Sequence, residues 1–161
     1  MATAVAEQIV DKVRTRLATI KTSGGYEITV SEVVRPTRYG GFRPQDLQLV
    51  VTQGTLERNA DLSHPGNPPA TAWDLEVIVA GLLMPSESST SKIDTLRNQF
   101  AADCIKAICT PQASWHNWDT LAILTEISTV EDVTTEESSG FKLTMTVTFR
   151  TDENSPYTVR S

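Results

Sequence analysis

Residues 141–150 alternate between apolar and polar side chains without interruption. The apolar positions are Phe141, Leu143, Met145, Val147 and Phe149, and the polar positions are Lys142, Thr144, Thr146, Thr148 and Arg150. A period of two belongs to a β-strand, whose successive side chains point to opposite faces of a sheet. The pattern therefore predicts a strand over about 141–151 with one face on a core. The other face, with its three threonines, should meet water or a neighbouring subunit.

Two segments, 2–22 and 91–110, show the periodicity of a helix instead. Their apolar residues recur at steps of three and four, which lines one side of each helix. These residues are Val5, Ile9, Val13, Leu17 and Ile20 in the first segment, and Ile93, Leu96, Phe100, Cys104, Ala107 and Ile108 in the second. We expect two amphipathic helices.

Further strands are predicted at about 26–35, 47–52 and 72–83, the last apolar on both sides and so expected in the middle of the sheet under cover on two faces. Residues 121–133 fit a helix or a strand, and their Thr, Ile and Val content favours a strand. Prolines and glycines predict a long loop over 54–70, and 152–161 reads as a polar tail. The fold class is α/β of the α+β type. It has a single mixed, mostly antiparallel sheet with two helices packed on it, in one domain over 1–161.

Charge is unevenly distributed in this chain of 161 residues with a formal net charge of −6. Every charged residue between 107 and 141 is acidic, whereas basic residues gather in the first 43. Copies could therefore attract one another head to tail, although a solvated acidic face explains the run equally simply. The acidic balance argues against nucleic acid. The longest apolar run, Val77–Met84, is too short to cross a bilayer, so we expect no membrane partner.

The chain offers little material for catalysis. Its two histidines, His64 and His116, stand in no metal-binding spacing. A hydrolase would need Cys104 or Cys109 activated by His116, but both cysteines lie on or beside the apolar side of a helix, where inert packing is usual. We expect no catalytic residue, no metal and no cofactor.

The last strand and the segment after it, FKLTMTVTFRTDENSPY (Phe141–Tyr157), resemble the closing segment of tail terminator (tail completion) proteins of long-tailed bacteriophages. The GY after the first helix, the VVRP that ends the first strand and the TAWDLEVIVAG strand are similar to the same family in placement. The resemblance implies a virion structural protein at the head-proximal end of the tail, made in the host cytoplasm. It would form a ring of about six subunits that caps the tail tube, ends tube polymerisation and docks the head or neck.

The resemblance implies three partners: copies of the chain itself, the tail tube protein and a neck or head-completion protein. Candidate contact residues follow partly from it and partly from exposed aromatic, basic and threonine positions. They are Arg38, Tyr39, Phe42, Arg43, Leu56, Arg58, Trp115, Trp118, Thr144, Thr146, Thr148 and Tyr157. The resemblance also implies that the loop Leu56–Pro69 contacts other subunits or the tube.

Three other readings stay open from the sequence. A head closure or neck connector protein belongs to the same class of virion proteins. A small cytoplasmic protein-binding domain without a virion role, and a hydrolase using a cysteine, belong to different classes. Oligomeric mass separates the ring former from the last two, which should be monomers or dimers.

Overall fold

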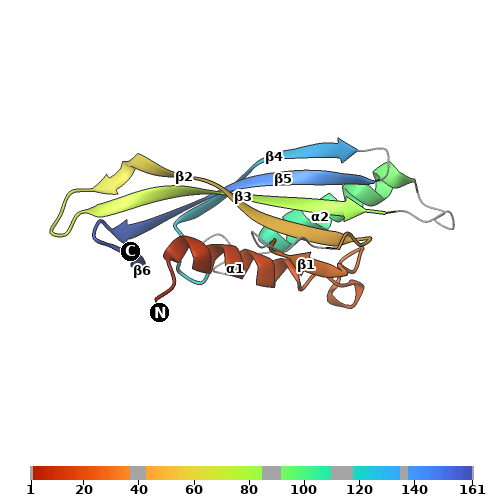
Figure 1. Ribbon diagram of the computed structural model, residues 1–161, viewed down its shortest axis with the longest axis horizontal. Helices are drawn as coiled ribbons and strands as arrows, with labels where there is room; N and C mark the ends of the chain where they lie inside the picture. The colour runs from red at the N-terminus through yellow and green to blue at the C-terminus, as the bar shows by residue number, and fades with distance from the viewer. Residues whose placement is uncertain (1, 37–42, 85–91, 110–117, 135–137, 161) are drawn as a thin grey trace.

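The computed structural model describes residues 2–36, 43–84, 92–109, 118–134 and 138–160. It contains one mixed sheet of six strands with two α-helices and a short 3-10 helix, which confirms the predicted fold class (Figure 1). The elements in chain order are α1 (Val5–Leu17), η1 (Thr22–Gly24), β1 (Glu32–Val34), β2 (Gln48–His64), β3 (Ala70–Leu83), α2 (Ile93–Cys109), β4 (Leu124–Thr134), β5 (Ser139–Asp152) and β6 (Ser155–Val159).

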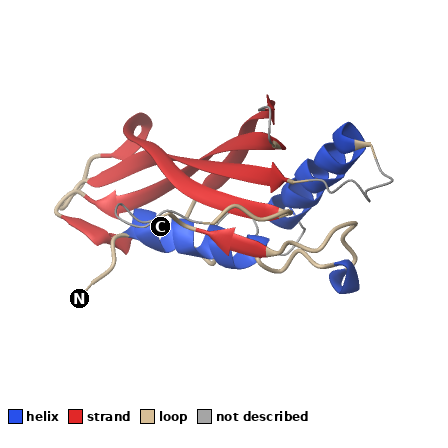
Figure 2. Cartoon of the chain, turned by 45° about the vertical axis from the view of Figure 1, so that its right-hand side comes forward, coloured by secondary structure: helices blue, strands red, loops and turns tan. Residues whose placement is uncertain are grey.

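The strand order in the sheet is β1-β2-β3-β5-β4, and the long strands form one twisted sheet (Figure 2). Only β1 runs parallel to its neighbour, and the other pairs are antiparallel. Strands β4 and β6 follow each other along the same edge of β5, with Leu124 opposite Thr148 and Val159 opposite Thr151. The strand predicted at 121–133 is therefore confirmed as β4.

Both helices pack on one face of the sheet. Buried residues of α1 and α2 join a single core with the residues of β3 and β5 that share one face, such as Val77 opposite Met145 and Val79 opposite Leu143. The predicted alternation of β5 is confirmed: its odd-numbered residues from Phe141 to Phe149 are all buried in this core.

The prediction that the 72–83 strand is covered on two faces is wrong. Between Asp74 and Leu82 its even-numbered residues are only half-buried, and no helix in the described ranges lies on them. Ile78, Ala80 and Leu82 make this second face apolar at one end of the strand, which explains why the sequence resembles a strand buried on both sides.

Strand β2 is much longer than predicted. The expected loop over 54–70 is strand as far as His64 and pairs with β3, so only 65–69 connects the two strands. Most side chains from Thr52 to Asp61 are exposed whichever way they point, so the period-two signal of a half-buried strand is missing there. The prolines and Gly66 that suggested a long loop are concentrated in the connection itself.

The ends of two other predicted elements also differ. Only Glu32–Val34 of the expected 26–35 strand pairs in the sheet, and residues 152–161 are not a plain tail because β6 folds back on β5. Arg160 ties this hairpin to the β2–β3 connection, since its Nη1 donates to Asp152 Oδ1 at 2.8 Å and also to the carbonyl of Pro68.

The segment between α1 and β1 is held by one buried carboxylate. Asp103 on α2 is 4% exposed, and its Oδ2 accepts hydrogen bonds from the backbone N–H groups of Glu27 and Ile28, both at 2.9 Å. These amides belong to no strand, so the carboxylate supplies the acceptor that a neighbouring strand would otherwise give. Asp103 therefore joins α2 to the chain that leads into β1.

Replacing Asp103 with Ala should leave two amides without an acceptor and lower the free energy of unfolding by about 3 kcal/mol, since hydrogen bonds to charged groups are each worth roughly 1.5–3 kcal/mol. Urea denaturation followed by circular dichroism measures the change. The matched control is Asp61→Ala at an exposed position, where less than about 0.5 kcal/mol is expected. Equal effects of the two substitutions would show that Asp103 has no such role.

Candidate interaction surface

The predicted contact residues are scattered over the molecule. Leu56, Arg58, Arg43 and Tyr157 are exposed, the first two on β2, Arg43 ahead of β2, and Tyr157 on β6 with 53% of its surface free. They do not form one patch, because β2 and β6 are separated by β3 and β5 in the sheet. Four further candidates lie outside the described residues: Arg38, Tyr39, Phe42 and Trp115.

Trp118 is not a surface residue, and its assignment to a partner contact is wrong. Its side chain is fully buried, and its indole Nε1 donates to Thr125 Oγ1 at 2.8 Å. The guanidinium of Arg16 lies 4.2 Å from the ring centroid. A tryptophan in a short polar segment suggested exposure, but the Trp118 ring lies in the core.

Trp118 is the first residue of a strained turn. Trp118, Asp119 and Thr120 all have positive φ angles between 49° and 72°, the left-handed region that non-glycine residues rarely occupy. Each such residue costs roughly 1–2 kcal/mol. The buried indole and the ion pair between Lys12 Nζ and Asp119 Oδ2, at 2.8 Å, hold the turn against α1. No sequence signal indicates this conformation.

The threonine face of β5 points away from the core, as predicted, but is not freely exposed. Thr148 is 5% exposed, and its Oγ1 donates to Asp74 Oδ1 at 2.6 Å. Asn59 Nδ2 donates to the other oxygen of the same carboxylate at 3.0 Å. Thr144 and Thr146 are half-buried in the same face. Thr148 therefore stabilises the sheet internally, and only the other two remain candidates for a contact.

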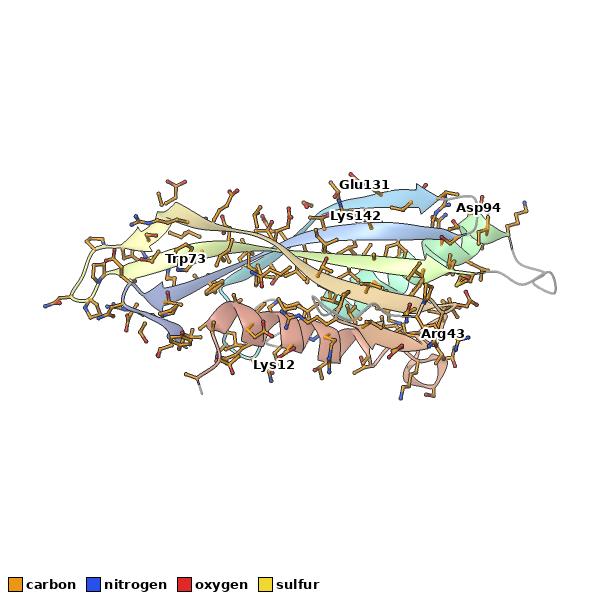
Figure 3. All side chains as sticks on the ribbon, in the orientation of Figure 1. Lys12, Arg43, Trp73, Asp94, Glu131 and Lys142 are labelled. Carbon is orange, nitrogen blue, oxygen red and sulfur yellow. The ribbon has the colours of Figure 1, made fainter. Side chains whose placement is uncertain are left out.

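One border of the sheet is acidic. Strand β4 contains Glu126, Glu131 and Asp132 and no basic residue. Glu126 is exposed on β4, Glu131 lies opposite Lys142, and Asp132 Oδ1 is 2.9 Å from Arg97 Nε of α2. Figure 3 shows Glu131 at the upper border of the molecule.

The opposite border carries mixed charge. It consists of α1, β1, the segment between them and the start of β2, and it exposes four basic and four acidic residues: Lys12, Arg14, Lys21 and Arg43, and Asp11, Glu27, Glu32 and Asp46. Lys12 and Arg43 lie along the lower border in Figure 3, across the sheet from Glu131. Because β1 and β4 are the outermost strands, the acidic border and this mixed border belong to opposite sides of one sheet.

Arg35 fixes β1 on the helix layer within this mixed border. Its guanidinium donates to both carboxylate oxygens of Glu7, with Nη2 to Oε2 at 2.8 Å, and to Asp11 Oδ1 at 3.3 Å. The hydrogen bond from Arg35 holds the pKa of Glu7 below its usual range, and the same bond raises the pKa of Arg35.

This pair predicts a pH effect on stability. Because the folded-state pKa of Glu7 lies below the unfolded value, its contribution is present above the usual glutamate pKa of about 4.3 and is lost as the pH falls through the lowered value. Thermal melting between pH 6 and pH 3 should show a smaller loss of stability for Glu7→Gln than for the wild type. Arg35→Gln should also reduce the pH dependence of the melting temperature between pH 6 and pH 3. The pH profile of the wild type in both variants would contradict the assignment.

Both cysteines lie in surroundings that disfavour the thiolate form. Burial, with a smaller contribution from the charge of Asp103, raises the pKa of Cys104, and burial also raises that of the half-buried Cys109. A thiolate is the reactive form, so both sites disfavour nucleophilic attack. His64 is exposed at the end of β2, and His116 lies outside the described residues. Within the described ranges, no three His, Cys, Asp or Glu side chains gather as a metal site requires.

Alkylation with iodoacetamide at neutral pH tests this assignment. Cys104 should react only after unfolding, while Cys109 should react slowly in the folded protein, and mass spectrometry of peptides separates the two sites. The urea-unfolded protein is the control, in which both must be labelled. Rapid labelling of Cys104 in the folded chain would indicate an activated thiol and would revive the hydrolase reading.

Comparison with protein-family models finds no match for this chain, and comparison with curated proteins finds no relative. Among the residues described, no helix is long and apolar enough to cross a membrane. We base a functional proposal on the acidic border of β4 and on the basic residues of α1 at the opposite border.

Proposed function

We propose that this chain is a virion structural protein that forms a ring on the tail tube of a long-tailed bacteriophage. The ring ends tube polymerisation and offers the docking surface for the head or neck. The proposal joins two lines of support, which are the resemblance of the segment Phe141–Tyr157 to tail terminators and the position of acidic β4 on the border opposite the exposed basic residues of α1.

The charged borders carry the proposal. A surface that complements a different surface of the same molecule leads to head-to-tail association, and such contacts close into a ring when the rotation between copies allows it. Acidic β4 and the exposed basic residues of the opposite border, such as Arg14 and Lys21, are such a pair. Closed rings leave no lateral site for another copy, which suits a component that ends a polymer.

Charge attraction between the borders predicts salt-sensitive assembly. Native mass spectrometry or analytical ultracentrifugation should find an oligomer of about six chains, alone or with tube protein. Glu126→Lys should raise the dissociation constant of the ring several-fold at 50 mM salt, and the difference should shrink near 1 M salt, where the Debye length is about 3 Å.

Glu153→Lys is the matched control, because Glu153 is exposed in the turn between β5 and β6 and undergoes the same change of charge. A chain that remains a monomer under all these conditions, including mixture with tube protein, would refute the proposal. Electron microscopy of particles lacking the protein then separates two functions: tails of uncontrolled length indicate a terminator, and normal tails without heads indicate a neck connector.

A further inference from the structure

Two of the long strands, β2 and β4, have an outer edge without a partner strand among the described residues. Strand β1 pairs only with Gln48–Val50, so the outer edge of β2 from Val51 to Asn59 has no described strand beside it. Strand β4 pairs with β5 on one side and with no described strand on the other. Such edges present rows of backbone N–H and C=O groups that can accept another strand.

The two edges have compatible directions. The pairs β2–β3, β3–β5 and β5–β4 are all antiparallel, so β2 and β4 run in opposite directions at the two sides of the sheet. When a second copy is placed beside the first by a rotation about an axis near the strand direction, its β2 meets the first copy's β4 as an antiparallel neighbour. The alternation of directions therefore continues across the junction.

The two edges also lie at the same height along the strands. One row of paired residues runs Thr52, Ile78, Thr144 and Thr129 across the sheet, and another runs Glu57, Asp74, Thr148 and Leu124. Residues 51–57 of β2 are thus level with residues 124–130 of β4. Residues 131–133 of β4 are level with residues 48–50 of β2, whose outer edge β1 occupies, so a ring brings the two stretches together with the neighbour shifted along the strand, away from β1.

We propose that each subunit joins the next by antiparallel pairing of its β4, residues 124–130, with the neighbour's β2, residues 51–59. The occupant of each edge is a second copy of this chain, and the result is one sheet that continues around the ring. This inference rests on the proposed ring and specifies how its subunits are joined.

Side-chain chemistry on both stretches permits the pairing. Neither stretch contains proline or lysine, the residues that commonly block an exposed edge. The charged residue of the β4 stretch is Glu126, and the β2 stretch carries the adjacent Glu57 and Arg58, both exposed and opposite in charge. Each edge has one irregularity, at Ser128 and between Gln53 and Leu56, so we expect two short runs of hydrogen bonds at the junction.

Disulfide trapping tests the junction directly. In Thr52→Cys/Thr129→Cys, the two cysteines of one subunit are three strand spacings apart, roughly 14 Å, and a disulfide needs Cα atoms within about 7 Å. Any bond between them must therefore link two subunits. A second double variant, Glu57→Cys/Thr129→Cys, covers a ring whose neighbours are shifted along the strand.

Mild oxidation of one of these double variants should give a ladder of covalent oligomers on a non-reducing gel, ending near six chains. Each single variant, and the control Thr158→Cys/Thr129→Cys with one cysteine on the exposed side of β6, should give no ladder. Linked dimers from Thr129→Cys alone would show that β4 meets another β4 and would overturn the inference.

The result also separates this inference from the proposed function. Wild-type rings without a ladder in either double variant would overturn strand pairing and leave the ring intact as a proposal. A wild-type chain that remains a monomer would contradict both the proposed ring and the strand pairing. A second, independent test uses single substitutions. Thr129→Lys should dissociate the ring without lowering the melting temperature of the subunit, whereas Thr158→Lys should leave the ring unchanged.

Discussion

The structure depends on the burial of one face of the β3–β5 pair under both helices. Val77 opposite Met145 and Val79 opposite Leu143 lie at the centre of this contact. A shift of one residue in the pairing would turn the apolar side chains of β5 to the other face, so the alternation in β5 fixes the register of the sheet. The close approach of Gly81 to the Phe141 ring fits the same register, because a Cβ at Gly81 would lie 2.2 Å from that ring.

Placing both helices on one face determines what the rest of the surface can do. The helices do not close the sides of the sheet, so β4 and the distal part of β2 keep their outer edges in the described structure. The charged residues of β4 at one side are all acidic, whereas the exposed basic residues of α1 lie at the other side among acidic ones. A protein arranged in this way is suited to binding copies of itself, and its proposed role in a ring rests on these surfaces rather than on a reacting group.

The sequence predicted the parts of the fold that bury an apolar face. The period of two in 141–150 and the helical periods of 2–22 and 91–110 correspond to β5, α1 and α2 because burial selects apolar residues at regular intervals. The distal part of β2 was missed because its side chains are exposed on both faces, which leaves no period. Trp118 was misplaced because its burial depends on a left-handed turn and on Arg16 from α1, neither of which leaves a local signal. Asp103 and Glu7 were missed for a similar reason, since their partners lie far away in the chain.

Amide hydrogen exchange, compared between the assembled ring and the dilute subunit, tests the central claim most directly. The claim is that copies join through the free edges of one sheet, so the backbone amides that form new hydrogen bonds must be those of β2 and β4. Assembly is predicted to slow exchange in residues 124–130 and 51–59 together, with little change in the already buried β3 and β5. Protection confined to the helices, or to the open face of β3 and β5 with both edges unchanged, would contradict the account.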